Sequence, residues 1–288
     1  MALTRRHDAL IWRANAAFVG PVQVRRSLPA ADIQSIGPIV FLDHFGPVDA
    51  PEGKLPAHPH AGIEVMTYLL QGANEHTDSQ GHVGQIADGG TQWMRAGAGI
   101  LHAERNLIDR ATTMHGLQIW ARLPIAEQDA EPAYRAFQAS DMPTWRQDGA
   151  DIRLLSGALR GHAGLIPLAL PSLMAHVRVS HGSSATITLP HPDHEYGVYT
   201  VSATDGARVD RHVLDRPGLA VRLAADAGTV LLTAGADQAA DFFLFGGEPA
   251  PQPLVYGGPF VLDSEAAIAK AQHRYEAGEM GTLDGVPF

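Results

Sequence analysis

Histidines and carboxylates that could bind a transition metal stand two residues apart at two places in this chain. The first is AHPHAGIEVM, which contains His58 and His60, with Glu64 four residues further on. On a β-strand, residues i, i+2 and i+4 share one face, so an even-numbered run would turn these three side chains toward one interior, with Met66 and Tyr68. Fifteen histidines in 288 residues make about one His-x-His pair expected by chance. The pair therefore needs a second group before it indicates a metal site.

The second group lies in GGTQWMRAGAGILHAERN, where His102 and Glu104 follow a glycine-rich turn. They are again two apart and would share a strand face. Two imidazoles from one strand, with an imidazole and a carboxylate from another, suit iron, nickel, manganese or copper better than calcium or magnesium, which prefer oxygen ligands. Spacing alone leaves both Glu64 and Glu104 as the carboxylate ligand. Each pair taken singly also fits a bland alternative, namely loop histidines or a hydrogen-bonded side-chain pair.

Composition excludes several other kinds of function. The chain has no cysteine, which rules out a disulfide scaffold, a thiolate metal site and a thiol nucleophile. A net charge of −10 makes direct nucleic-acid binding unexpected, and no stretch approaches the length of a membrane span. The amino-terminal MALTRRHDALIWRANAAFVG lacks an apolar secretion core and is interpreted as a first strand of a cytoplasmic protein.

The elements that must position these residues are predicted to be β-strands. Short apolar runs between turn residues, such as GPIVFLDHFGP and EVMTYLLQG, fill residues 11–123 and resume from Ile152, which indicates antiparallel barrels or sandwiches. Residues 124–144 are acidic and bounded by prolines, so they are predicted to be a linker between two domains; the alternative is one long surface loop within a single domain. The only helix expected is SEAAIAKAQHRYEAG, with Ser264 as N-cap and Gly278 after its last turn.

The two halves of the chain share a weak similarity. HPHAGIEVMTY and HPDHEYGVYT both begin with His-Pro and run into a strand. The second copy, at His191 and His194, has lost the alternation of ligands. The sequence therefore predicts a metal in the first half only.

At four separate places, in order, the sequence resembles the pirin family of cupin proteins. The shared stretches are FLDHFGP, HPHAGIE running on to MTYLL, GGTQWM with AGAGILHAE, and FGGEP followed by GGPFV before the final helix. The resemblance implies an all-β bicupin of two antiparallel β-barrel domains, here residues 1–123 and 145–288, the second ending in a helix. It also implies one iron per chain in the amino-terminal domain and none in the other, although nickel, manganese, copper or zinc could occupy the site on isolation.

The same resemblance implies roles for individual residues. The ligands would be His58, His60, His102 and Glu104, and Glu64 would orient a ligand histidine through its other ring nitrogen. Val65 and Leu69 would then face the opposite side of their strand. The expected pocket walls, which ordinary core packing would explain equally well, are Met66, Trp93, Met94 and Ile100.

Some pirins are similar in activity to quercetin 2,3-dioxygenases, which open a flavonol ring with dioxygen and release carbon monoxide. The resemblance therefore implies an enzyme that acts on a flavonol and dioxygen. Chemically, Glu104 would then accept the substrate proton, and the protein is expected to be a monomer. The alternative is a non-enzymatic, redox-sensing regulator that binds a transcription factor or a metabolic enzyme. A purely structural cupin is disfavoured by the intact set of ligands. Sequence does not decide between enzyme and regulator.

Overall fold

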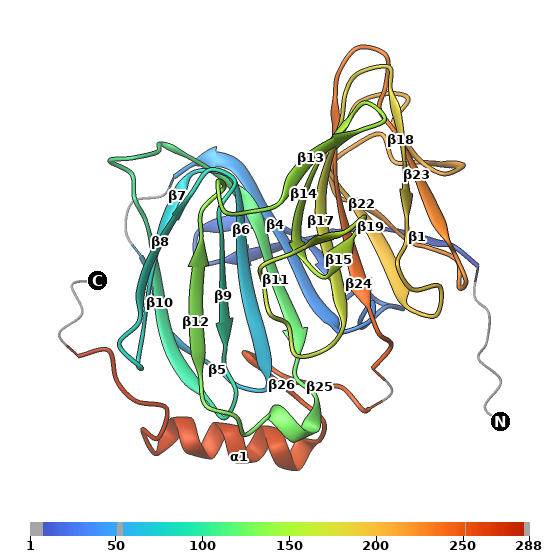
Figure 1. Ribbon diagram of the computed structural model, residues 1–288. Helices are drawn as coiled ribbons and strands as arrows, with labels where there is room; N and C mark the ends of the chain where they lie inside the picture. Colours follow the sequence, from blue (N-terminus) through green and yellow to red (C-terminus); the bar gives the residue numbers. More distant parts are fainter. Residues whose placement is uncertain (1–7, 51–53, 251, 285–288) are drawn as a thin grey trace, which may run out of the picture. The chain divides into compact units, whose positions relative to one another are not determined.

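The computed structural model describes residues 8–50, 54–250 and 252–284. These residues form two compact units (Figure 1). Of the described residues, the unit that we call the N-terminal barrel comprises 16–24, 40–50, 54–141 and 252–284, and the C-terminal barrel comprises 8–15, 25–39 and 142–250. The ends of the predicted domains, at residues 1 and 288, lie outside the described residues.

The N-terminal barrel is built from two antiparallel sheets. Its smaller sheet has the order β5-β10-β7-β8 and its larger sheet the order β12-β9-β6-β11-β4-β3-β2. The smaller sheet consists of β5 (Lys54–His60), β10 (Ile100–Asn106), β7 (Ala73–Asp78) and β8 (Val83–Ala87). The larger consists of β12 (Ala133–Phe137), β9 (Thr91–Arg95), β6 (Ile63–Gln71), β11 (Thr113–Arg122), β4 (Ile39–Asp49), β3 (Val22–Leu28) and β2 (Asn15–Val19).

The C-terminal barrel repeats this plan with the sheets β1-β22-β19-β24-β17-β14-β13 and β18-β23-β20-β21. The strands of its larger sheet are β1 (Leu10–Arg13), β22 (Leu219–Arg222), β19 (Glu195–Ser202), β24 (Ala240–Gly247), β17 (Ser172–Val179), β14 (Ala150–Ser156) and β13 (Thr144–Gln147). The smaller sheet has β18 (Ser184–Thr188), β23 (Thr229–Thr233), β20 (Arg208–Val209) and β21 (His212–Val213), and a hairpin joins β15 (Ala158–Leu159) to β16 (His162–Ala163).

Alternating side chains explain the core of the C-terminal barrel. Val177 and Val179 on β17 are fully buried in one apolar cluster, whereas the side chain of Arg178 between them is 56% exposed. This is the pattern of a sheet with one face on a core. The predicted β-barrels with a single carboxy-terminal helix are thus confirmed for the part of the chain that is described.

The carboxy-terminal segment differs from its predicted place, because it belongs to the N-terminal barrel. It forms β25 (Val255–Gly257), β26 (Phe260–Leu262) and α1 (Glu265–Glu276). Ser264 caps α1 by accepting a 3.2 Å hydrogen bond from the amide of Ala267, as predicted. One face of α1, with Ile268 and Ala271, packs in a cluster that contains Ala61 and Phe260.

The predicted linker also carries regular structure. Residues 124–144 contain a short 3-10 helix, η1 (Ile125–Glu127), and the strand β12, which pairs with β9 along five residues. Because an edge strand is held by backbone hydrogen bonds and is only half covered, it needs no clear alternation of apolar side chains. None of the helices within the described ranges has the length and apolar content that crossing a membrane would require.

Candidate metal centre

Three of the predicted ligand histidines meet where β5 and β10 pair. The antiparallel register places His58 opposite His102 and His60 opposite Ile100. The ring of His102 lies 4.3 Å from that of His58 and 5.1 Å from that of His60, between ring centroids. One nitrogen from each of the three rings lies within 4.8 Å of the others. β5 carries Pro56 and Pro59 inside a strand, which is tolerated because β5 is at the edge of its sheet.

Backbone carbonyls fix the orientation of two of these rings. The Nδ1 of His58 is 2.8 Å from the carbonyl oxygen of Pro56, and the Nδ1 of His60 is 2.9 Å from that of Pro259. A carbonyl only accepts, so Nδ1 must carry the proton in both rings. The Nε2 lone pair of each ring is then available to a metal ion.

The third ring is oriented by a chain of side chains that the sequence analysis missed. His76 on β7 lies with its Nε2 3.0 Å from a carboxylate oxygen of Asp78 and its Nδ1 3.4 Å from the Nδ1 of His102. An ionised carboxylate only accepts, so the Nε2 of His76 carries the proton toward Asp78 and the Nδ1 of His76 accepts from His102. This arrangement leaves the Nε2 of His102 unprotonated. Among the described residues that atom is buried and has no hydrogen-bond partner, which fits a metal ligand.

Electrostatics favour neutral rings at this centre. Burial lowers the pKa of His60 to about 3, helped by His58 and opposed by the carbonyl of Pro259. Burial also lowers the pKa of His102 well below its usual value, and the three neighbouring histidines add to the effect. Burial alone would raise the pKa of Asp78, but the hydrogen bonds from His76 and His82 outweigh it and lower the pKa. His60 and His102 are therefore neutral rings, and the ionised carboxylate of Asp78 lies behind His76.

Glu104 is held by a polar network beside the histidines. One of its carboxylate oxygens, Oε1, accepts hydrogen bonds from the amide of Gln92 and, at 3.3 Å, from the hydroxyl of Thr67. The hydroxyl of Tyr134 donates to Gln92 at 3.1 Å. The pKa of Tyr134 is raised by burial and by the Glu104 and Asp78 carboxylates, so this hydroxyl keeps its proton.

The structure groups Glu104 differently from the predicted ligand set. His58, His60 and His102 form one cluster of ligand atoms, and His76, His102 and Glu104 form another. His102 is common to both, and Glu104 is not grouped with His58 or His60. His76 and Asp78 have the same i, i+2 spacing as His58 and His60 and as His102 and Glu104. The sequence could therefore have indicated His76 and Asp78 as part of the site.

Glu64 has a different partner from the one expected. Its carboxylate accepts a 3.0 Å hydrogen bond from the indole nitrogen of Trp93. The Nδ1 atoms of the three clustered histidines are instead engaged by Pro56, Pro259 and His76. Orientation of a ligand histidine, the role predicted for Glu64, is therefore carried by these groups.

The predicted faces of β6 are reversed. Thr67 on β6 reaches Glu104, so the odd-numbered residues Val65 and Leu69 share the side of the site. Glu64 and Met66 then point the other way. The reason is that β5 ends at His60 and β6 begins at Ile63, and the turn between them, with Gly62 at φ +78°, breaks the alternation.

The four expected pocket residues divide between the two faces. Met94 and Ile100 share an apolar cluster with Val65, on the side of Glu104. Met66 and Trp93 are directly paired across β6 and β9, and both lie on the side of Glu64.

Aromatic rings that the sequence analysis did not single out lie close to the histidines. Trp120 on β11 lies edge-on to His60, with ring centroids 4.9 Å apart, and stacks on Phe41 at 4.1 Å. Tyr134 stacks on His76 at 4.1 Å. These rings, together with Met94 and Ile100, supply the apolar surroundings of the centre.

Comparisons with known proteins find similarity to pirins along most of the chain. The model of the pirin family matches residues 21–121, and that of the pirin C-terminal cupin domain matches residues 174–281. Pirin of Rattus norvegicus is 30% identical over 264 residues, which cover 91% of this chain and 89% of its own length. A Pseudomonas aeruginosa protein, named as a proposed quercetin 2,3-dioxygenase, is 33% identical over 297 residues and covers 98% of this chain and 89% of its own length.

The fold is also similar to that of a solved structure. The crystal structure of quercetin 2,3-dioxygenase from Acinetobacter baumannii superposes with a TM-score of 0.89 at 25% identity, covering 98% of this chain and 93% of that one. The expected bicupin fold is thereby confirmed.

Proposed function

Because the chain belongs to the pirin family, we propose that it is a mononuclear iron protein with quercetin 2,3-dioxygenase-type activity. One iron per chain would be held in the N-terminal barrel by the Nε2 atoms of His58, His60 and His102 and by the carboxylate of Glu104. The observation that carries this proposal is the Nε2 of His102, which is buried and has no hydrogen-bond partner in the described part of the chain. It lies in a cluster whose other two rings also have Nδ1 occupied.

A bound iron would supply a Lewis acid that makes a coordinated hydroxyl more acidic, and redox chemistry toward dioxygen. The protein's own part begins with Glu104. Glu104 would be ligand and base in turn. Its Oε1 is engaged by the amide of Gln92, so Oε2 is the oxygen for both roles, and it would accept the proton of the flavonol 3-hydroxyl when it does not hold the ion. Gln92, which itself accepts a hydrogen bond from Tyr134, would keep the carboxylate in place during that transfer.

Trp120 and Phe41 would bind the flat rings of the substrate. Their stacked pair lies directly beside His60, and aromatic surfaces pack well on a polyphenol. The low polarity of these walls would also limit water around the reacting atoms.

The test is turnover of quercetin by the iron-loaded full chain. We expect the visible absorption of quercetin to fall under air with release of carbon monoxide, and anaerobic mixing to give binding without turnover. The matched control is the same protein stripped of metal. Unchanged absorbance with iron and oxygen both present would contradict the dioxygenase and favour the regulator, whose partner binding would then differ between Fe(II) and Fe(III).

A further inference from the structure

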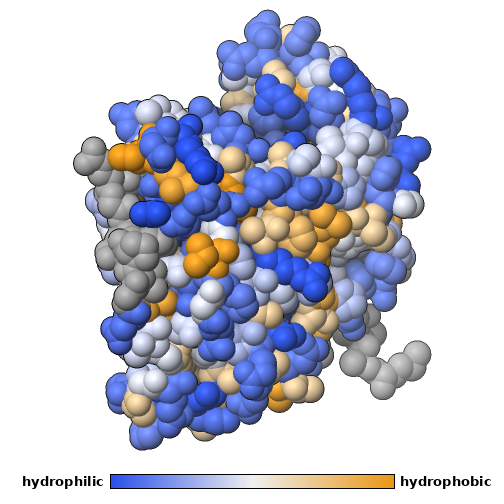
Figure 2. Space-filling view, turned by 60° about the vertical axis from the view of Figure 1, so that its left-hand side comes forward, coloured by the Kyte–Doolittle hydropathy of each residue, from blue (hydrophilic) through white to orange (hydrophobic). Residues whose placement is uncertain are grey.

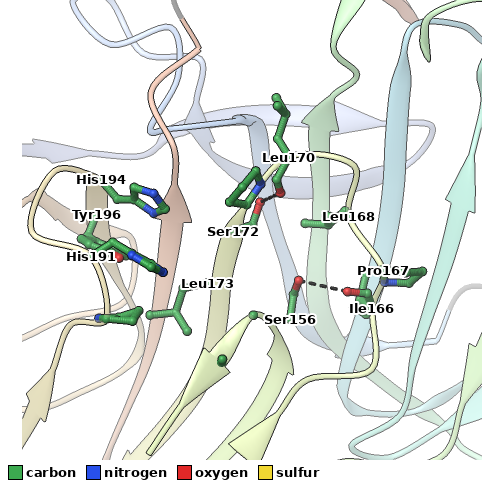
Figure 3. A pocket seen from close by; sticks show the side chains of 14 residues that line it. Ser156, Ile166, Pro167, Leu168, Leu170, Ser172, Leu173, His191, His194 and Tyr196 are labelled. Carbon is green, nitrogen blue, oxygen red and sulfur yellow. Dashed lines mark hydrogen bonds between the residues drawn. The ribbon is translucent and has the colours of Figure 1, made fainter. Parts of the chain in front are cut away.

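The C-terminal barrel has a pocket of its own, with a volume of about 300 Å³ (Figure 3). One end is lined by Ile166, Pro167 and Leu168. His191 and His194 lie next to each other at the other end of the pocket in Figure 3. The volume is at the lower end of the range of ligand sites, about 300–1,000 Å³. The pocket therefore has room for water or a small ligand next to the imidazoles.

The two histidines belong to one turn. The amide of His194 donates a 3.2 Å hydrogen bond to the carbonyl of His191, which brings the rings to 4.4 Å between centroids. Asp193 lies between them in sequence, and one ligand atom from each of the three side chains lies within 4.8 Å of the other two. The carboxylates of Asp193 and Glu248 both act on His194 electrostatically. Two imidazoles with carboxylates around them are a donor set for a divalent cation.

We propose that this turn binds a second transition-metal ion through His191, Asp193 and His194. Imidazole and carboxylate donors suit zinc, cobalt and nickel. The imidazoles are accessible, since His191 is exposed and His194 partly so. His191 and His194 both line the pocket, so a small ligand in the pocket would lie next to two of the three donors.

The proposal differs from the expectation of a metal-free C-terminal domain. That expectation concerned ligands that alternate along a strand, as His58 and His60 do. His191, Asp193 and His194 instead precede β19 on a turn, where spacing of i, i+2 and i+3 brings them together. This site is independent of the iron site and of the proposed dioxygenase activity.

The test is a titration of the chelator-treated full chain with Zn²⁺ by calorimetry, with Co²⁺ as a probe whose visible spectrum reports its ligands. We expect wild type to bind two ions, with the second weaker. The double variant His191→Ala/His194→Ala should lose one equivalent and its share of the Co²⁺ spectrum. Asp193→Asn should weaken that equivalent at least tenfold, and His58→Ala/His102→Ala should keep it.

The control is His181→Ala, another exposed histidine of the same barrel, which should titrate as wild type does. Binding of only one ion by wild type would overturn the proposal. So would two equivalents retained by the double variant. Because the three side chains are at the surface, the variants are expected to fold, and unchanged melting temperatures would verify it.

Discussion

His58, His60 and His102 share one tautomer, protonated at Nδ1, because groups outside the cluster accept a hydrogen bond from each Nδ1. Two backbone carbonyls and the side chain of His76 each engage an Nδ1 atom. Every Nε2 is thus unprotonated before an ion arrives, and the rings have little freedom left to lose. A site arranged in this way binds metal with a smaller entropic cost than three free imidazoles would.

His76 and Asp78 should therefore matter for metal affinity although the sequence resemblance names neither as a ligand. His76→Ala removes the acceptor of His102, and Asp78→Asn removes the carboxylate that fixes His76. We expect metal affinity to fall by about ten- to a hundredfold in each, measured by competition with a chelator. The control is His82→Ala, which also loses a bond to Asp78 but lies outside the ring cluster. An equal loss in His82→Ala would contradict this role.

Two glutamates offer the sharpest comparison at single residues. Glu104→Gln removes a negative charge from the site, so metal retention should fall and turnover should nearly vanish. Glu64→Gln keeps an oxygen that accepts from Trp93, and the ion should be retained. Metal per chain after dialysis against a weak chelator measures both. If Glu64→Gln lost the ion while Glu104→Gln kept it, the assignment of the carboxylate ligand would be wrong.

Among the elements, α1 depends on a glycine in β25. A Cβ added at Gly257 would lie 2.4 Å from the Cγ2 methyl of Ile268, which packs α1 against β25 and β26. Gly257→Ala should lower the free energy of unfolding by about 1–3 kcal/mol through overpacking. Gly228→Ala is the matched control, because its Cβ would meet nothing within 4 Å. Equal midpoints of the two variants in urea would contradict the close packing of α1.

A charged cluster joins three strands of the C-terminal barrel. Asp241 on β24 accepts hydrogen bonds from His176 and Arg178 on β17 and from Ser202 on β19. Burial alone would raise the pKa of Asp241, but these partners, with His176 the largest, lower it to about 2. A depressed folded-state pKa stabilises the protein above the unfolded value of about 3.9, and the effect is lost as the pH falls toward 2.

The variant Asp241→Asn tests whether Asp241 stabilises the protein above about pH 4 and loses this effect toward pH 2. Wild type should exceed the variant by about 2 kcal/mol in free energy of unfolding at neutral pH, and the difference should shrink between pH 4 and pH 2. Urea unfolding at several pH values measures it. Arg216→Ala, which removes an exposed ion pair with Asp215, should show no comparable dependence. A difference that stayed constant down to pH 2 would contradict the assignment to Asp241.

Three features could be predicted from sequence because their signals are local. Alternation of apolar residues predicted the barrels, and Ser264 predicted the cap of α1. The repeated i, i+2 spacing predicted that His58, His60 and His102 meet. The face of β6 could not, since one turn at Gly62 reverses the parity. Nor could the carbonyl of Pro259, which lies 199 residues from His60. Backbone acceptors carry no signature in residue types.

At the scale of the molecule, the N-terminal barrel is not continuous in sequence. Residues 252–262 supply β25 and β26, a parallel bridge from Ala61 to Phe260, and the carbonyl that orients His60. Arg122 on β11 also donates to the carbonyls of Gln252 and Pro253. Residues 1–123 therefore lack part of the structure around the metal centre.

A chain that ends at Ala250 should consequently retain little metal, even though all four proposed ligands are present. Elemental analysis of purified protein measures the metal per chain. Full-length Pro259→Ala is the control, because it changes the side chain but keeps the carbonyl, and it should retain metal. Full metal content in the shortened chain would contradict the need for this segment.

The acceptor for His60 has a consequence for biosynthesis. During synthesis, β5 and β10 leave the ribosome long before Pro259 does. While more than a hundred further residues are added, the histidines are exposed and the ring of His60 has no carbonyl to orient it. Iron captured at that stage would be loosely held and open to the solvent, where it could generate damaging oxygen species. We expect tight capture to wait for the last segment, so that an interrupted translation product does not carry a reactive ion.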